Sequence, residues 1–237
     1  MAVLLCILAV VMVPRVAEAQ ANNTTTAATT TLATTTPVGP PSCPNTQMTN
    51  ILRGIFLDTH NNLRGSLARG QTERRGTSGE IAPPASLMYR MRYDCNAESY
   101  AQQHVNSCDR VLSDPAARPG YKENINILDR TDTTPEGAAQ WALTRWWGQL
   151  ARNGVPSNMI FSEAVRNRQT GIVTKFTKMA WWDNINLGCA VRNCNSFYFT
   201  SCMYGPGGNI VGSSIYTIGA VCSGCPAGCV GGLCPAP

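Results

Sequence analysis

Two stretches of the chain decide its fold: Thr174-Lys175-Phe176-Thr177-Lys178-Met179-Ala180-Trp181 and Cys202-Met203-Tyr204-Gly205-Pro206-Gly207-Gly208-Asn209-Ile210. The second stretch carries the end of an apolar run, residues 197–204, into a turn rich in Gly and Pro. The runs 187–191 and 215–218 are equally short and bounded by turn-forming residues, which is typical of strands joined by turns. We therefore expect the chain after Asn184 to form an antiparallel sheet.

Before this region, apolar residues recur at the three- and four-residue spacing of amphipathic helices. A first helix is expected from Thr46 to Ala68, with Gly70 as its stop. Its apolar stripe is Met48, Ile51, Leu52, Ile55, Phe56, Leu63 and Leu67. A second helix is indicated by Met88, Met91, Cys95, Ala101, Val105 and Cys108.

A third helix has a clear start, because Thr134 suits the N-cap and Pro135 the first helical position. Gly154 is expected to end it. Its buried face would carry Trp141, Trp146 and Leu150. Helices followed by an antiparallel sheet predict a layered α+β fold.

The N-terminal residues predict export. The chain is almost wholly apolar from Met1 to Val13 and then reads Ala17-Glu18-Ala19, so residues 1–19 are expected to be removed as a signal peptide. No stretch approaches the roughly 20 apolar residues that a spanning helix needs. We expect a secreted, extracellular protein that does not span a membrane.

Residues 20–42 form a leader rich in Thr, Ala and Pro with almost nothing to bury, so we expect it to be disordered and O-glycosylated. Overlapping N-x-Thr acceptors begin at Asn22 and Asn23, the expected N-glycosylation sites. About 180 residues remain between Cys43 and Val221, which is enough for one domain with a core.

Cysteine usage agrees with export. The sequence contains 11 cysteines, and loss of Cys6 with the signal peptide leaves ten, an even number that permits five disulfides. A zinc site at Cys222-x-x-Cys225 and Cys229 is the alternative, but such sites are mainly intracellular. We expect structural disulfides and a small stapled tail.

The formal net charge of +5 at pH 7 is modest, and the basic residues are scattered without interleaved aromatic residues. Nucleic acid is therefore not an expected partner. The pair Arg74-Arg75, which has glycines on both sides, predicts a mobile exposed loop.

Several motifs occur together in one order. Besides the two stretches quoted above, they are His60-Asn61-Asn62-Leu63-Arg64, Glu123-Asn124-Ile125, Trp146-Trp147 and Leu187-Gly188-Cys189-Ala190. In this order they resemble the CAP superfamily of cysteine-rich secretory, antigen 5 and pathogenesis-related proteins. Tyr93-Asp94-Cys95, together with the Thr-rich leader and the four-cysteine tail, is most similar to the activation-associated secreted proteins of parasitic nematodes.

The resemblance extends from about Cys43 to Cys234. It implies a three-layer α-β-α sandwich with a central antiparallel sheet, and it divides this part of the chain into a CAP domain at 43–220 and a Cys-rich tail at 221–237. It also implies five disulfide pairs: Cys43–Cys95, Cys108–Cys194, Cys189–Cys202, Cys222–Cys229 and Cys225–Cys234.

Many members of that superfamily have a cleft in which two His and two Glu suit a divalent metal. At those positions this chain has Leu112 for the first His, Glu123 for the first Glu, Gln149 for the second Glu and Lys175 for the second His. Zinc prefers imidazole and carboxylate ligands, and an ammonium group repels it, so we expect no metal and no other cofactor here.

Lys175 is instead expected to reach Glu123 and to satisfy its buried carboxylate. The alternative is that both side chains face solvent in a shallow groove. The sequence contains two histidines, His60 and His104, and each is expected to be buried and structural. No Gly-x-Ser-x-Gly elbow occurs, although a Ser-His-Asp triad stays open because its members need not be neighbours.

The leading hypothesis is a non-enzymatic secreted protein that binds a host or other extracellular protein receptor, or a hydrophobic ligand such as a sterol, as the resemblance implies. Host interaction or immune modulation is its expected context. One alternative is a degenerate-site hydrolase that uses His60 or His104 with Glu123. Another is an inhibitor of proteases or channels that acts through the Cys-rich tail. The sequence leaves open whether the protein forms a homodimer.

Overall fold

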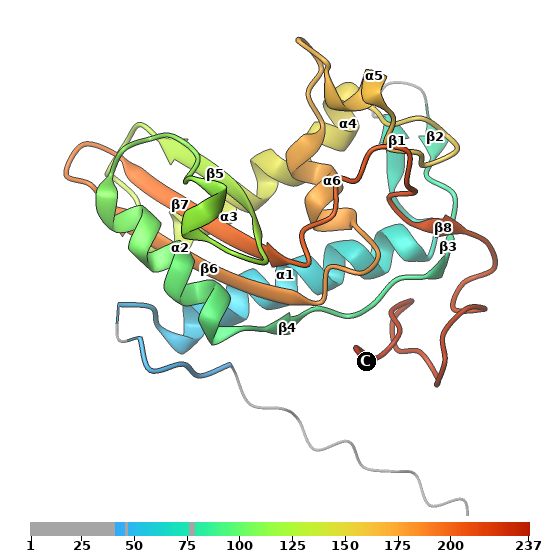
Figure 1. Ribbon diagram of the computed structural model, residues 1–237, viewed down its shortest axis with the longest axis horizontal. Coiled ribbons are helices and arrows are strands. Elements are labelled where there is room, and N and C mark those ends of the chain that lie inside the picture. Colours follow the sequence, from blue (N-terminus) through green and yellow to red (C-terminus); the bar gives the residue numbers. More distant parts are fainter. Residues whose placement is uncertain (1–40, 46, 76–78) are drawn as a thin grey trace, which may run out of the picture. The chain divides into compact units, whose positions relative to one another are not determined.

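The computed structural model describes residues 41–45, 47–75 and 79–237 (Figure 1). The expected signal peptide and the two N-glycosylation sites, Asn22 and Asn23, lie outside these residues. The helices are α1 (Asn50–Ala68), α2 (Cys95–Ser107), the 3-10 helix η1 (Pro115–Ala117), α3 (Pro135–Trp147), α4 (Gln149–Asn153), α5 (Glu163–Arg166) and α6 (Thr174–Ala180). The strands are β1 (Glu73–Arg75), β2 (Glu80–Ile81), β3 (Ala85–Leu87), β4 (Arg92–Tyr93), β5 (Lys122–Leu128), β6 (Asn186–Asn193), β7 (Tyr198–Gly205) and β8 (Thr217–Ile218).

A four-stranded sheet in the order β4-β6-β7-β5 forms the middle layer. The pairs β6–β7 and β7–β5 are antiparallel, whereas the short β4 runs parallel to β6. Helix α2 covers one face of the sheet, and α1 and α3 lie on the other face (Figure 1). The fold is α+β with helices on both sides of a central sheet, as expected.

The three strands expected from the sequence are present as β6, β7 and β8, but they do not form one sheet, because β8 pairs with β3 in a separate two-stranded sheet. Strand β5 was not expected. Its residues Glu123, Asn124 and Asn126 are buried although they are polar. A buried strand is usually recognised in a sequence by its apolar residues, so this strand gave no such signal. It is an outer strand of the four-stranded sheet, and it positions the candidate site.

Helix α1 begins later than expected, because Thr49 is its N-cap and accepts a hydrogen bond from the Leu52 amide at 3.1 Å. Gly70 follows the end of the helix with φ +67°, a left-handed conformation that suits glycine. The prediction that Ile51 belongs to the buried stripe is wrong, because its side chain is 69% exposed. Helix α2 starts at Cys95, capped by Asp94, so Met88 and Met91 precede it.

The expected third helix is split. Thr134 caps α3 by accepting from the Gly137 amide at 3.1 Å, but α3 ends at Trp147, and the short α4 ends at Asn153, just before Gly154. Trp146 is buried as expected, whereas the prediction for Trp141 is wrong, since 46% of it is exposed. Five residues along a helix are a rotation of about 140°, so these two tryptophans cannot share one buried face.

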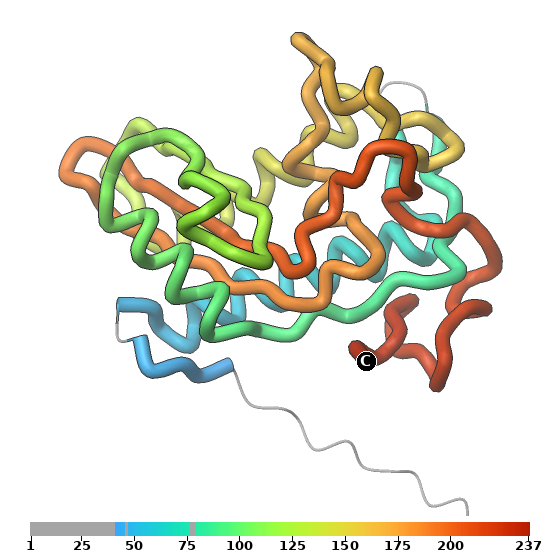
Figure 2. The backbone as a smooth tube through the Cα atoms, in the orientation of Figure 1, coloured from blue at the N-terminus to red at the C-terminus, as the bar shows by residue number. Residues whose placement is uncertain are grey.

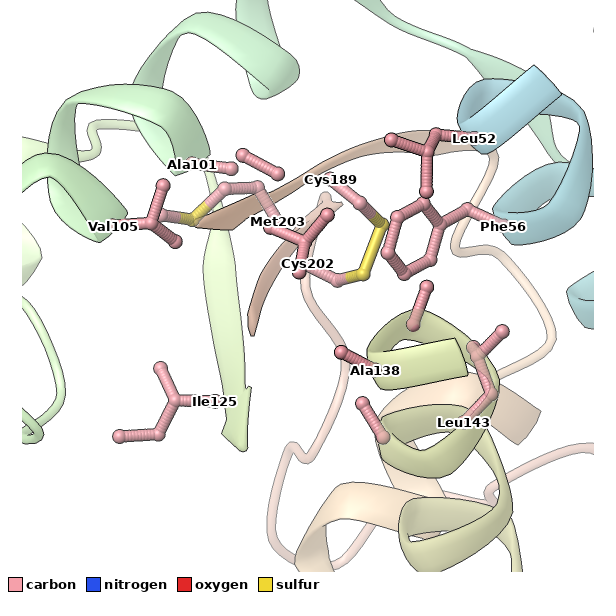
Figure 3. Close-up of a cluster of buried hydrophobic side chains, with 14 of the residues drawn as sticks. Leu52, Phe56, Ala101, Val105, Ile125, Ala138, Leu143, Cys189, Cys202 and Met203 are labelled. Atoms are coloured by element: carbon pink, nitrogen blue, oxygen red, sulfur yellow. A yellow bond between two sulfur atoms is a disulfide. The ribbon is translucent and has the colours of Figure 1, made fainter. Parts of the chain in front are cut away.

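The structure contains the five disulfides that the resemblance implies. The Cys189–Cys202 bridge joins directly opposed residues of β6 and β7 and is fully buried. Figure 3 shows labelled side chains of α1 and α3 gathered beside this bridge, and those of α2 on its other side. The bridge is therefore part of the hydrophobic core.

The Cys-rich tail packs on the domain. The Cys234 amide donates to the Met88 carbonyl at 2.8 Å, and the Gly224 amide donates to the Ser86 carbonyl at 2.9 Å. The tail can be followed in Figure 2 as the last red segment of the tube. Its contacts with residues 86–90 show that the tail is held along the chain segment that precedes α2.

Arg74 and Arg75 belong to β1, which pairs with β2, so the prediction of a loop at this pair is wrong. The Arg74 guanidinium donates to the Val155 carbonyl at 2.6 Å. Within the part of the chain that the structure describes, no helix is both long and apolar enough to cross a membrane.

Candidate functional site

The carboxylate of Glu123 is the centre of the candidate site. It lies near the start of β5, and the residue is 2% exposed. Ser201 Oγ donates to it at 2.6 Å, the Ser113 amide at 2.9 Å and Ser113 Oγ at 2.7 Å, and His104 Nδ1 donates a further short bond. These donors come from β7, from the loop before η1 and from α2, so Glu123 ties three segments together.

His104 projects from α2 and is 8% exposed. Its ring meets Phe199 edge to face at 5.0 Å, and its Nε2 lies 3.3 Å from Asp109 Oδ1. Burial disfavours the charged imidazolium, but the hydrogen bond and charge of Glu123 outweigh it and raise the pKa of His104. Burial also opposes ionisation of Glu123, yet the bonds from His104 and the two serines lower its pKa. The two residues therefore form an ion pair.

Lys175 does not pair with Glu123, and that prediction is wrong. The Lys175 ammonium donates to the main-chain carbonyl of Ile125 at 2.7 Å instead. Glu123 already accepts from four other protein donors. Burial, followed by the charge of Arg145, lowers the pKa of Lys175.

Gln149 begins α4 and reaches the start of α6. Its Oε1 accepts from the amides of Lys175 at 2.9 Å and Phe176 at 3.0 Å. Helix α6 has no side-chain cap of its own, so Gln149 satisfies two of its N-terminal N–H groups. Leu112 lies in the loop after α2 and is 55% exposed.

The four positions that the resemblance matches to metal ligands line two different cavities. Leu112 and Glu123 line one cavity of about 460 Å³, here called the Glu123 cavity. Gln149 and Lys175 line another of about 340 Å³, here called the Lys175 cavity, beside the outer edge of β5. The structure does not bring the four side chains together around one point.

These residues do not fit a metal ion. Leu112 offers no lone pair, Lys175 is a cation, and the Oε1 atom of Gln149 is engaged by two amides. The Glu123 oxygens accept four hydrogen bonds from protein donors. One carboxylate with its acceptor sites already used is not the three- or four-ligand set that zinc takes in proteins.

A second group with metal-ligand chemistry lies in the tail. The sulfur atoms of Cys222, Cys225 and Cys229 lie within 4.8 Å of one another. Cys222 is bonded to Cys229, and Cys225 is bonded to Cys234. Since zinc binds cysteine as the thiolate, these disulfides exclude the zinc alternative for the tail.

His60 is a buried structural residue, as the sequence led us to expect. Its Nδ1 donates to the Phe56 carbonyl at 2.7 Å, and its Nε2 accepts from the Tyr204 hydroxyl at 2.9 Å. Burial lowers its pKa to about 4. His60 is thus engaged at both nitrogens, while His104 is the histidine that the fold brings to Glu123.

Lys178 is a feature of this region that the sequence reasoning missed. It lines the Glu123 cavity and donates to Asn124 Oδ1 at 3.0 Å. Burial, followed by the charge of Lys175, lowers its pKa to about 7. The three-residue spacing of Lys175 and Lys178 in a helical segment was the available signal, because it places both ammonium groups on one side of α6.

A family model described as the cysteine-rich secretory protein family, CAP, matches residues 57–204. The Ancylostoma secreted protein of Ancylostoma caninum is 41% identical over 200 residues, which are 82% of this chain and 47% of that protein. The chain therefore spans about half the length of that relative.

Two solved structures extend the comparison. The crystal structure of NaASP2 with Zn²⁺ is 36% identical and superimposes with a TM-score of 0.76 over 81% of this chain and 100% of that one. The hookworm platelet inhibitor is 25% identical, with a TM-score of 0.59 over 81% of this chain and 94% of that one. The fold is thus shared with NaASP2 and with the hookworm platelet inhibitor.

Proposed function

Since this chain belongs to the cysteine-rich secretory protein family, CAP, we propose that it is a secreted, non-enzymatic protein that acts by binding an extracellular host protein. The observation that carries the proposal is the state of Glu123, whose carboxylate is used in holding α2, β5 and β7 together. A general base needs an acceptor free to take a proton from substrate, and here that acceptor is engaged.

The serines beside Glu123 support the same proposal. Ser113 and Ser201 both donate their hydroxyl hydrogens to Glu123, and neither donates to His104. A catalytic serine needs its hydroxyl hydrogen bonded to the base that will deprotonate it. The arrangement is a hydrogen-bonded cluster in which neither serine is set up as a nucleophile, which supports the non-enzymatic proposal.

One relative supports the choice of partner class. It is a platelet inhibitor by name, and the chain itself is similar to it over most of both lengths. We infer that a protein on the surface of a host blood cell is the class of partner to test first. The Ancylostoma secreted protein, also a secreted product, is consistent with the same context.

The test compares binding and catalysis in one set of variants. The secreted protein is measured for saturable binding to washed platelets and for turnover of peptide and ester substrates. Glu123→Gln and Ser201→Ala, each checked by circular dichroism, are expected to bind like the wild type when folded. Turnover by the wild type that a folded Glu123→Gln variant loses would establish the hydrolase alternative instead.

A second candidate function is the binding of a hydrophobic ligand such as a sterol. A separate observation supports it. A cavity of about 460 Å³ lies between α1 and α3, and it is lined in part by Leu63, Leu143 and Trp147. Cavities of this size with apolar walls are typical of small-molecule sites.

This candidate is tested by native mass spectrometry of the protein purified from secreting cells. A lipid-sized adduct is expected on the wild type and is expected to be lost in Leu63→Trp, which fills the cavity. Arg145→Met, a change in the Lys175 cavity, is the matched control. A wild type that carries no adduct after incubation with sterol would remove this candidate and leave the protein-binding proposal standing.

A further inference from the structure

The Lys175 cavity concentrates positive charge. Its lining includes Arg110 from the loop after α2, Arg145 from α3, Arg152 from α4 and Lys175 from α6, and none of its lining residues is acidic. Four cations from four segments around about 340 Å³ repel one another unless an anion lies among them. A cavity of this volume is large enough for a small ligand.

Three of the four cations keep donors available. Arg145 has no side-chain hydrogen bond or ion pair within the described part of the chain. Arg152 donates one bond to the Arg145 carbonyl at 2.7 Å, and Lys175 donates one to Ile125 at 2.7 Å, so each retains further N–H groups. Arg110 is already paired with Asp129 at 2.8 Å.

The open edge of β5 adds neutral donors. Trp146 Nε1 and Lys175 Nζ both donate to the Ile125 carbonyl, at 3.0 and 2.7 Å, so the polar groups of Ile125 point away from β7. In an antiparallel strand the N–H and the carbonyl of one residue point to the same edge of the strand. The N–H and carbonyl of the residue two positions later point to that edge as well. The N–H groups of Ile125 and Ile127 therefore face this edge.

Asn126 provides an independent indication. It lines the same cavity and is 6% exposed, and its Nδ2 has no hydrogen-bond partner within the described residues. A buried amide N–H without an acceptor costs free energy, and such groups in native proteins usually have a partner. The missing partner is an acceptor, as the surrounding donors also require.

We propose that the Lys175 cavity binds a small oxyanion, a phosphate or sulfate ester group, through Arg145, Arg152 and Lys175. Guanidinium groups bind such oxyanions by two parallel N–H donors, and the ammonium adds a point charge. Asn126 Nδ2, which is buried beside these groups and lacks a partner among the described residues, is a further donor on this side of β5. This binding site does not depend on the protein-binding function proposed above.

The chemistry of the two replaced positions agrees with this assignment. The resemblance places a Glu and a His where this chain has Gln149 and Lys175, so a negative charge has been removed and a positive charge added. Burial and Arg145 lower the pKa of Lys175, and a bound anion would counteract both effects. Gln149 and Lys175 suit an anion, whereas the Glu and His that the resemblance places at these positions suit a cation.

An acidic peptide that adds a strand to β5 is the competing occupant. Strand addition needs the carbonyls of the edge to be free, and the Ile125 carbonyl is covered by Trp146 and Lys175. The cavity of about 340 Å³, lined by residues of α3, α4 and β5, suits a small group better than an extended chain.

Isothermal titration calorimetry of the full secreted chain at low ionic strength tests the proposal. The probes are phenyl phosphate and phenyl sulfate, with phenol as the neutral control. We expect saturable binding of one or both esters, no binding of phenol, and at least tenfold weaker binding to Arg145→Met/Arg152→Met, because each charge-assisted bond is worth about tenfold or more. Tighter binding of one ester identifies which oxyanion the cavity prefers.

The matched control is Arg130→Met, which removes an exposed arginine outside the cavity and is expected to bind like the wild type. Lys175→Gln keeps a donor for Ile125 and is expected to weaken binding at an unchanged fold. Failure of both esters to bind the wild type, or an equal loss in Arg130→Met, would overturn the proposal. Displacement of phenyl phosphate by tighter-binding tetraglutamate would overturn it in favour of strand addition.

Discussion

Gln149 accepts a hydrogen bond from the amide of Lys175 at 2.9 Å, so two positions that the resemblance assigns to metal ligands contact each other directly. The same Oε1 accepts from Phe176. Through these bonds the start of α4 is joined to the start of α6, and no ion is required to link them. The residues at these two positions thus link the two segments through a side-chain to main-chain hydrogen bond.

Removal of this acceptor is expected to destabilise the fold. Gln149→Ala leaves two helix N-terminal amides unsatisfied, so the free energy of unfolding should fall by about 1 to 3 kcal/mol. Gln149→Glu keeps the acceptor at the positive end of a helix and should unfold near the wild-type midpoint. Urea unfolding measures both, with the exposed Gln169→Ala as the control; a Gln149→Ala midpoint equal to that control would contradict the capping role.

The buried pair of Arg53 and Glu98 supports a second prediction. Arg53 donates to both carboxylate oxygens, at 2.7 and 2.8 Å, and the residues are 2% and 0% exposed. Glu98→Gln leaves a buried guanidinium without its counter-charge and should cost about 3 to 5 kcal/mol. The double variant Arg53→Met/Glu98→Met should cost clearly less than the sum of its single changes. Additive losses in a urea-unfolding double-mutant cycle would show that the two side chains do not interact.

Local sequence patterns predicted the elements whose apolar residues follow a regular period. Thr134 and Pro135 marked the start of α3, and the runs at 187–191 and 197–204 became β6 and β7. The pattern failed where buried residues are polar. Strand β5 was missed because Glu123, Asn124 and Asn126 are buried only through partners from other segments.

The candidate site depended even more on tertiary structure. The resemblance identified Glu123, but its partner was expected to be Lys175 and is His104, a residue 19 positions away that α2 brings to the strand. The length of α2 and its packing on β6 decide this, and neither is written in the residues around Glu123. The two separate cavities could not be predicted for the same reason.

A pH dependence follows from His60. Its pKa is lowered from 6.5 to about 4 by burial, so below pH 6.5 the unfolded chain binds a proton that the folded chain does not. Stability should therefore decrease as the pH falls from about 6.5 to 4, with a contribution on the order of 3 kcal/mol from this residue. Urea unfolding of the wild type and of His60→Gln across this range isolates the contribution, because the carboxylates titrate in both. Parallel pH profiles of the two proteins would refute it.

The contact of α2 with the sheet depends on Gly188. A Cβ atom at this position would lie 2.1 Å from the Glu98 amide nitrogen and 2.6 Å from the Ala97 Cβ, and two of its three nearest atoms are backbone, which cannot rotate away. Gly188→Ala should therefore destabilise the protein by more than about 3 kcal/mol and reduce its folded yield. Gly54→Ala is the matched control, because its nearest neighbour would be Asp58 Oδ2 at 3.9 Å and the site is inside a helix.

The control is expected to change stability in the opposite direction. Alanine in a helix interior is more favourable than glycine by about 0.5 to 1 kcal/mol, so Gly54→Ala should raise the urea midpoint. Opposite signs from the same substitution would show that the close approach of α2 to β6, and not the loss of a glycine, sets the cost at Gly188. That approach also holds His104 against Glu123, so Gly188→Ala should raise amide hydrogen exchange in α2 and β5 together. If exchange increased in β6 alone, the packing of α2 on β6 would not be what holds His104 against Glu123.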